Sequence, residues 1–168
     1  GAEPVFLDSD AGTLGLSPVA LENFLQAQAE RGPDGTRLRS DGRRIAACLP
    51  MHVLGHACRI REICALCEAW GIPVVEDAAE ALGSTLDGRH LGLFGRIGVL
   101  SFNGNKTVTT GGGGMLLTMD PELGARAKHL TTTAKRPHLW EFFHDETAWN
   151  FRLPNVNAAL GCAQMERI

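Results

Sequence analysis

Residues 58–77, with the sequence CRIREICALCEAWGIPVVED, contain the pattern that decides the fold. Apolar residues recur at helical spacing from Ile60 to Trp70, and Gly71 is typical of a helix end. Residues 72–75 then form a short apolar run typical of a buried strand, and two acidic residues follow it directly. The segment therefore predicts a helix over about residues 58–70 and a strand with polar groups at its carboxyl end.

The same alternation continues on both sides of this segment. Ser17 before Pro18, and Asp120 before Pro121, are signatures of helix starts; we expect these helices to end near Gly32 and Ala134. Further strands are expected at residues 4–7, 45–49, 97–102 and 115–118, and the polar stretch 31–44 is expected to be an exposed loop. Strands that alternate with helices predict an α/β domain with a largely parallel sheet flanked by helices.

Composition and charge narrow the class of protein. The chain has 168 residues, of which 44% are hydrophobic and 21% charged, as is usual for one globular domain. A formal net charge of -3 offers no basic surface for nucleic acid. Because there is neither an apolar run of membrane-spanning length nor a signal-peptide pattern, we expect a cytoplasmic protein with no membrane partner.

Five cysteines admit two interpretations, packing and metal binding. Cys64 and Cys67 form a C-x-x-C pair, with Cys58 and two histidines upstream, so a zinc site is conceivable. The pair lacks a second C-x-x-C partner and falls at the helical spacing of a buried stripe. We therefore favour packing of reduced thiols in the core.

Polar residues follow three of the expected strands: His52, then Asp77, then the run from Ser101 to Lys106. Open α/β sheets bind their ligands just outside the carboxyl ends of the strands. Pyridoxal phosphate needs an amine for its aldehyde, a carboxylate facing its ring nitrogen, and hydrogen-bond donors for its phosphate. Lys106, Asp77 and Ser101 match these needs, although Asp77 is also suited to cap an Ala-rich helix expected to follow it.

The glycine run 111–114 does not complete a nucleotide-binding motif. A strand, and not a helix, is expected to follow it, and Gly104-Asn105-Lys106 lacks the adjacent Gly-Lys of a P-loop. We expect these glycines to let the backbone pass close to a cofactor or a partner chain.

Five segments together carry a resemblance to the DegT/DnrJ/EryC1/StrS family of sugar aminotransferases. These segments, in the order of the family and over essentially the whole chain, are PMHVLG (50–55), VEDAAEALGS (75–84), SFNGNK (101–106), TTGGGGM (109–115) and WNFRLPNVNAALG (149–161). The resemblance implies the large domain of a pyridoxal-phosphate-dependent transferase of fold type I. Since members are about twice as long, it also implies that residues 1–168 are an incomplete large domain, with an N-terminal segment and a C-terminal small domain absent.

The resemblance assigns roles to individual residues. Lys106 corresponds to the Schiff-base lysine, Asp77 to the carboxylate at the pyridine nitrogen, and Ser101 to a phosphate ligand. Asn150 corresponds to an asparagine that reaches the phosphate of the neighbouring subunit, which implies a homodimer with shared active sites.

The roles of two further residues, Glu80 and His52, follow less directly from the resemblance. Glu80 stands where many members have glutamine or histidine near the phenolic oxygen of the ring, and a carboxylate beside a phenolate is repulsive unless it is protonated or bridged. His52 is open between a contact with cofactor or substrate and local hydrogen bonds within its loop.

The implied activity moves an amino group from glutamate to a nucleotide-linked keto-deoxy sugar. The motifs SFNGNK and TTGGGGM are similar to the branch that acts on UDP-4-keto-6-deoxy-N-acetylhexosamines for surface polysaccharides. A catalytically degenerate or regulatory member and a pyridoxal-phosphate-dependent sugar dehydratase are the alternatives. We expect the isolated 168 residues to be inactive and loosely packed or poorly soluble, because a truncated core exposes apolar surface.

Overall fold

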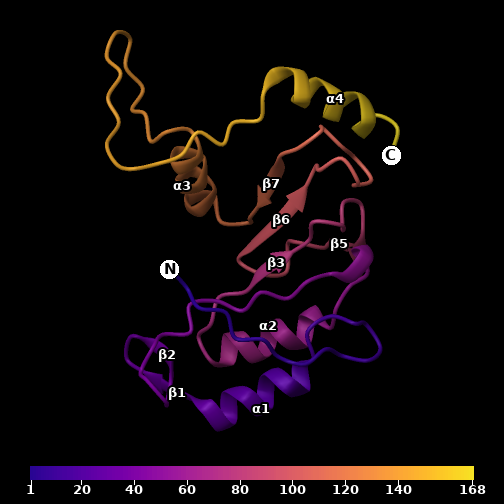
Figure 1. Cartoon of the computed structure of the whole chain (residues 1–168), viewed down its shortest axis with the longest axis vertical. Helices are drawn as coiled ribbons and strands as arrows, with labels where there is room; N and C mark the ends of the chain where they lie inside the picture. Colours follow the sequence, from indigo (N-terminus) through magenta and orange to yellow (C-terminus); the bar gives the residue numbers. More distant parts are fainter.

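The computed structural model describes all residues from 1 to 168. Figure 1 shows an elongated molecule with helices α1 and α2 at one end, a small sheet in the middle, and helices α3 and α4 at the other end. The helices are α1 (Pro18–Gln28), η1 (Val53–Gly55), α2 (Ile60–Ala69), α3 (Pro121–Thr131) and α4 (Asn155–Met165). The strands are β1 (Ala29–Gly32), β2 (Gly35–Leu38), β3 (Val75–Asp77), β4 (Thr85–Leu86), β5 (Arg89–His90), β6 (Ile97–Ser101) and β7 (Gly114–Leu117).

Both predicted helix starts are confirmed. The Ser17 hydroxyl accepts a hydrogen bond from the Ala20 amide at 3.2 Å, and Pro18 opens α1. The Asp120 carboxylate accepts hydrogen bonds from the amides of Glu122 and Leu123 before α3. Side-chain acceptors at these positions satisfy backbone amides that have no partner within the helix.

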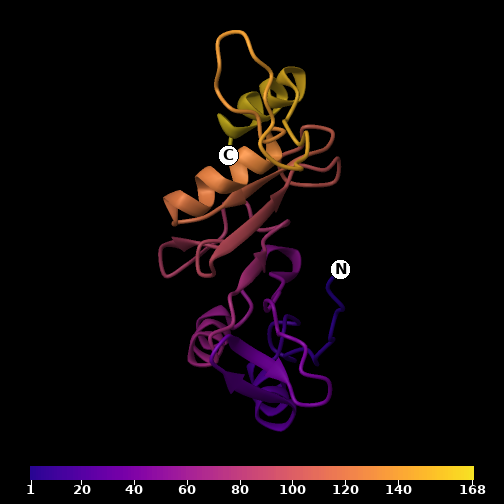
Figure 2. The same cartoon turned by 90° about the vertical axis from the view of Figure 1, so that its left-hand side faces the viewer.

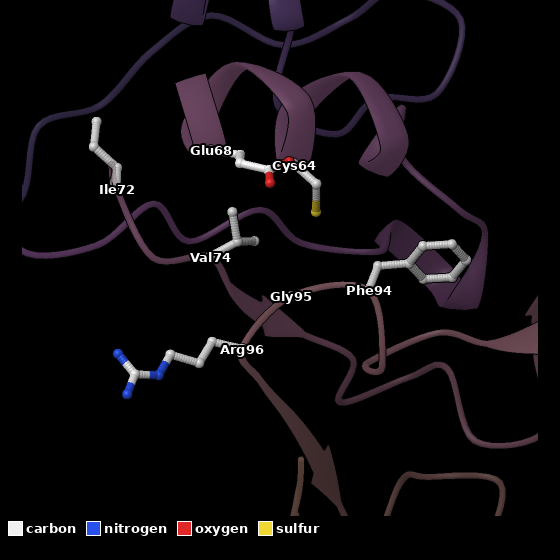
Figure 3. A pocket seen from close by; sticks show the side chains of 7 residues that line it. All are labelled: Cys64, Glu68, Ile72, Val74, Phe94, Gly95 and Arg96. Atoms are coloured by element: carbon white, nitrogen blue, oxygen red, sulfur yellow. The ribbon is translucent and has the colours of Figure 1, made fainter. Parts of the chain in front are cut away.

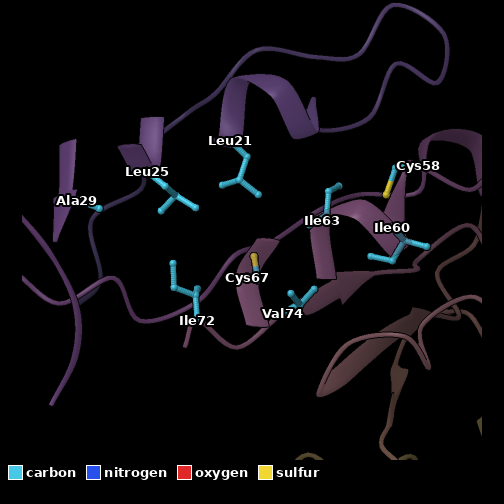
Figure 4. Packing of buried hydrophobic residues seen from close by; sticks show 9 residues of the cluster. All are labelled: Leu21, Leu25, Ala29, Cys58, Ile60, Ile63, Cys67, Ile72 and Val74. Carbon is cyan, nitrogen blue, oxygen red and sulfur yellow. The ribbon is translucent and has the colours of Figure 1, made fainter. Parts of the chain in front are cut away.

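The main core lies between α1, α2 and the start of the sheet (Figure 4). Three side chains of α2, those of Ile60, Ile63 and Cys67, are completely buried and face Leu21 and Leu25 of α1. Cys58 joins the same cluster, and Cys64 and Trp70 pack against it. The predicted packing of the cysteine stripe is therefore confirmed.

The central sheet has the order β3-β6-β7, with β3 and β6 parallel and β6 and β7 antiparallel. The predicted strand at residues 45–49 is only partly regular. Its backbone runs parallel to β3 through the hydrogen bonds Val75 N to Cys48 O and Asp77 N to Pro50 O, both 2.9 Å. Pro50 has no amide hydrogen, so the segment forms isolated bridges in place of a continuous ladder.

Four predictions of local structure were wrong. The helix that begins at Pro18 ends at Gln28 and not near Gly32, because residues 29–32 form β1. No helix follows Asp77, where residues 78–84 contain turns.

Residues 4–7 form no strand, since no neighbouring strand pairs with them and backbone pairing begins only at Ser9, which bridges Leu16. The predicted loop 31–44 instead contains part of the antiparallel hairpin of β1 and β2. The end of α2 explains this hairpin, because the buried Thr36 hydroxyl donates to the Trp70 carbonyl and Arg31 lies over the Trp70 ring. Such tertiary contacts are not visible in local sequence patterns.

The last third of the chain is built differently. In Figure 2, α3 lies along β7, and α4 follows a long loop at the top of the molecule. Neither helix has a buried residue. The Gln164 side chain ties α4 to the loop after β6 by bonding both the amide and the carbonyl of Thr109, at 3.1 and 2.6 Å. No helix in the structure is long and apolar enough to cross a membrane.

Candidate active site at the carboxyl edge of the sheet

The carboxyl ends of β3 and β6 define one polar edge of the sheet. The two strands are parallel, with Val75 opposite Ile97 and Asp77 opposite Val99. β3 ends at Asp77 and β6 ends at Ser101, so both side chains belong to the same edge. Parallel pairing thus brings together two candidates that lie 24 positions apart in the sequence.

Lys106 is presented by the loop that joins β6 to β7. The loop is closed at its base by the hydrogen bonds Phe102 N to Gly113 O, 2.9 Å, and Thr110 N to Phe102 O, 3.0 Å. The lysine side chain is only 17% exposed, and its Nζ lies 3.4 Å from the Glu80 carboxylate. The Lys106 side chain is therefore mostly covered and directed toward Glu80.

Glu80 connects Lys106 to the turn after His52. One carboxylate oxygen of Glu80 faces Lys106, and the other accepts a hydrogen bond of 2.9 Å from the Leu54 amide. Of the proposed site residues, Lys106 and Glu80 are the pair in direct contact. A cavity of about 440 Å³ borders this turn, between Leu14 on one side and Val53 and Leu54 on the other.

Asp77 and Ser101 each keep hydrogen-bonding capacity for a ligand. One oxygen of the half-buried Asp77 carboxylate accepts from the Ala79 amide at 3.1 Å, as a cap does, and the other oxygen has no partner. The Ser101 hydroxyl oxygen accepts from the Asn103 amide at 3.3 Å, so its hydrogen is free to be donated. The edge therefore offers an amine, a carboxylate oxygen and a hydroxyl donor, which fits the chemistry of pyridoxal phosphate.

Below this edge lies a buried polar network that the sequence analysis missed. Glu76 and His52 have fully buried side chains, and the Glu76 carboxylate accepts from His52 Nε2 at 2.9 Å. The same carboxylate accepts from the amides of Gly92 at 2.8 Å and Gly95 at 2.5 Å. His52 Nδ1 accepts from the Cys58 amide at 3.3 Å, which assigns the ring hydrogen to Nε2.

This network holds an ionised carboxylate inside the protein. Burial alone raises the pKa of Glu76, but the hydrogen bonds from His52 and from the Gly95 and Gly92 amides outweigh it and lower the pKa below its ordinary value. The network fixes Glu76, which is next to Asp77, and His52, which begins the turn whose Leu54 amide contacts Glu80. Both nitrogens of the His52 ring are used in hydrogen bonds within the protein, one to Glu76 of β3 and one to the Cys58 amide of the following segment.

One signal in the sequence indicated the burial of Glu76. Val74, Glu76 and Ala78 alternate along the strand, and all three are buried. In a strand, residues two apart face the same side. A strand extended through residue 78 would have placed Glu76 on the apolar face.

Asn150 lies away from this edge. It is exposed, forms a backbone bridge with Thr132 after α3, and makes no side-chain hydrogen bond. No contact within the chain brings it to Lys106, Asp77 or Ser101. The predicted role toward a neighbouring subunit therefore stays a prediction.

A second cavity lies at the opposite edge of the sheet. It has a volume of about 210 Å³ and is lined by residues before β3 and β6. Figure 3 shows Cys64 and Glu68 pointing into it from α2. Burial, reinforced by the charge of Glu76, raises the pKa of Cys58 to about 12 and that of Cys64 to about 11, so these thiols stay protonated at neutral pH.

A cluster of charged residues joins α3 to the following loop. His129 lies 2.7 Å from Asp145 and 3.6 Å from Glu146, a grouping of metal-ligand type. Arg126 pairs with Glu146, and Arg136 pairs with Asp145 at 3.1 Å. Because both carboxylates are paired with arginine, the cluster is best described as an ion-pair clasp.

Solved structures of aminotransferases share this fold. The structure superposes with a TM-score of 0.82 on an aminotransferase from Psychrobacter cryohalolentis, at 29% identity over 99% of this chain and 41% of that chain. The aminotransferase TlmJ from Streptoalloteichus hindustanus gives a TM-score of 0.81 and 33% identity over 99% of this chain and 41% of that chain. The predicted α/β class and the partial fold of such an enzyme are confirmed.

The chain belongs to the DegT/DnrJ/EryC1/StrS aminotransferase family, which it matches over residues 1–168. It is 41% identical over 165 residues to EpsN of Bacillus subtilis (strain 168), whose name is "Putative pyridoxal phosphate-dependent aminotransferase", covering 98% of this chain and 40% of that protein. It is 35% identical to the GDP-perosamine synthase of Escherichia coli O157:H7, covering 99% of this chain and 41% of that protein. The chain thus spans about 40% of the length of the curated relatives it matches.

Proposed function

We propose that these residues are part of a pyridoxal-phosphate-dependent sugar-nucleotide aminotransferase in which Lys106 is the catalytic lysine. The observation that carries the proposal is the inward-turned Lys106 side chain, 17% exposed and 3.4 Å from Glu80, at the edge shared by Asp77 and Ser101. In this proposal the chain is an incomplete large domain. The activity therefore belongs to a longer protein with a C-terminal small domain.

Pyridoxal phosphate, when bound, supplies an electron-withdrawing ring that stabilises negative charge on the amino-donor carbon. Lys106 would hold the cofactor through its amine, which would bond to the aldehyde carbon. The same amine, when free, would accept the proton of the amino-donor carbon. Its inward orientation suits both tasks, because one nitrogen atom must reach two neighbouring carbons.

Asp77 and Ser101 hold the cofactor from opposite ends. The unpartnered oxygen of Asp77 is suited to face the protonated ring nitrogen and keep it protonated by charge. The free hydroxyl hydrogen of Ser101 is suited to the phosphate. Asn150, exposed and without a side-chain partner, would complete the phosphate site of a second subunit in a homodimer.

The overall reaction converts glutamate to 2-oxoglutarate while the keto carbon of the sugar becomes an amine. We propose a UDP-4-keto-6-deoxy-N-acetylhexosamine as the amino acceptor. The similarity to GDP-perosamine synthases makes a GDP-linked keto-deoxy sugar the competing acceptor. A screen of UDP-linked and GDP-linked 4-keto sugars with the full-length protein decides between them.

Replacement of Lys106 tests the catalytic role. The chain contains three lysines, Lys106, Lys128 and Lys135, so Lys128→Ala on the surface of α3 is a matched control. In the full-length protein, we expect Lys106→Ala to abolish transamination measured by 2-oxoglutarate release, because no other amine lies at this edge, and Lys128→Ala to keep the wild-type rate. Substantial turnover by Lys106→Ala would refute the proposal. If the wild-type protein dehydrates the sugar without aminating it, the dehydratase alternative is supported.

A further inference from the structure

We propose that Glu80 is a positioning residue for Lys106: it holds the free amine of the lysine as an ion pair at the edge of the sheet. The inference rests on the proposed catalytic role of Lys106 and deepens it. In this chain, the partner of the Glu80 carboxylate is the lysine itself, and not the phenolic oxygen of a cofactor ring.

The geometry of the carboxylate carries this inference. Glu80 Oε1 lies 3.4 Å from Lys106 Nζ, and Glu80 Oε2 accepts a hydrogen bond of 2.9 Å from the Leu54 amide. Nζ has no other hydrogen-bond partner. The Glu80 side chain is 37% exposed, and its carboxylate bridges a backbone amide and the lysine nitrogen, so two contacts within the protein direct it.

The turn that supplies the Leu54 amide is pressed against the backbone of Glu80. Gly55 has a φ of +80°, and a Cβ added there would lie 2.5 Å from the Glu80 carbonyl oxygen. Leu54 itself adopts a φ of +51°, which is unfavourable for a leucine. Close packing of glycine against Glu80 therefore fixes the amide that orients the carboxylate.

A carboxylate near a phenolate is repelled unless its charge is compensated. While Lys106 is not bonded to the cofactor, its ammonium would compensate the charge of Glu80, as a bridging cation would. Glutamine or histidine at this position would be neutral and would hold the lysine without a full opposite charge. Glu80 therefore keeps the amine directed toward the edge of the sheet during the part of the cycle in which it is not bonded to the cofactor.

Lysine reactivity in the cofactor-free, full-length protein tests the ion pair directly. Trace labelling with acetic anhydride at pH 7.5, followed by peptide mass spectrometry, measures the acetylation rate of Lys106 relative to Lys128 and Lys135. Glu80 holds the lysine nitrogen against the edge of the sheet, so we expect Glu80→Gln to raise the relative rate at Lys106 about twofold to fivefold, the range of a partly exposed ion pair. The matched control Glu68→Gln, on the exposed face of α2, should leave the three rates unchanged.

A charge-specific measurement separates positioning from a merely structural role. Raising the salt concentration from about 0.05 to 0.5 M should increase Lys106 labelling in the wild type and not in Glu80→Gln, because salt screens the pair. This comparison needs only the wild type if Glu80→Gln fails to fold.

An unchanged or slower rate in a folded Glu80→Gln protein, or no effect of salt on the wild type, would overturn the inference. The proposed function fails by a different result, which is transamination activity in the Lys106→Ala variant.

Discussion

The first 110 residues and the last 58 residues of the chain are stabilised in different ways. All but one of the 26 buried residues lie in the first region, the exception being Ala134. There, α1 and α2 each bury three residues, five of which belong to a shared core, whereas α3 and α4 bury none. The two regions show that similar helix lengths say little about how well a helix is packed.

The second region is held mainly by polar contacts. Gln164 fixes α4 to Thr109, and the clasp of His129 with Asp145 fixes the long loop to α3. Large apolar side chains such as Trp140 and Phe142 are about 80% exposed there. Loose packing, which we predicted for the isolated chain as a whole, is therefore expected mainly in this region.

The largest effect should come from the buried network of the first region. Glu76→Ala removes the acceptor for His52 and for the Gly92 and Gly95 amides, which leaves two buried donors and one partly buried donor unsatisfied. We expect a loss of about 3–5 kcal/mol in the free energy of unfolding, measured by urea denaturation. Glu22→Ala, exposed on α1, should change it by less than about 0.5 kcal/mol; equal effects would contradict the importance of the network.

Two matched leucines sharpen the comparison between regions. Leu25 in α1 is 1% exposed, and Leu160 in α4 is 53% exposed. In the 168-residue chain, Leu25→Ala should cost about 2–5 kcal/mol because it leaves a cavity, and Leu160→Ala about 0.5 kcal/mol or less. A large cost at Leu160 in urea denaturation would mean that α4 is packed more tightly than its contacts indicate.

A smaller effect is expected from acid. Because the pKa of Glu76 is lowered from 4.5 in the folded protein, its contribution to stability is complete above about pH 4.5 and is lost as the pH falls through the folded value. The difference in urea midpoint between wild type and Glu76→Ala should therefore be constant from pH 5 to 7 and should shrink below pH 4.5. A difference that persists unchanged at pH 3 would show that the carboxylate charge is not what stabilises the network.

The sequence predicted the elements that have strong local signals. The caps at Ser17 and Asp120, the apolar stripe of α2 and the strands before Asp77 and Lys106 were found in this way, and the structure confirms them. The sequence did not predict the β1–β2 hairpin, which depends on contacts with Trp70. Nor did it predict the effect of Pro50 on pairing with β3. These depend on which surfaces meet in the folded chain, which no local pattern contains.

The sequence predicted which residues belong to the candidate site, but it did not predict which of them are in contact. Lys106, Asp77 and Ser101 were selected because each follows a strand, and the parallel pairing of β3 and β6 brings the last two to one edge. The contact of Glu80 with both Lys106 and the Leu54 amide was not predictable. It depends on the turn at Gly55, whose fit against Glu80 is a property of the folded backbone.

The most direct test of the account is to identify the lysine that bonds to the cofactor. The full-length protein, loaded with pyridoxal phosphate, would be reduced with borohydride and digested, and the modified peptide mapped by mass spectrometry. The account predicts a phosphopyridoxyl group on Lys106, with Lys128 and Lys135 unmodified. An unmodified Lys106 in the presence of excess cofactor would contradict it and favour a degenerate or regulatory member of the family.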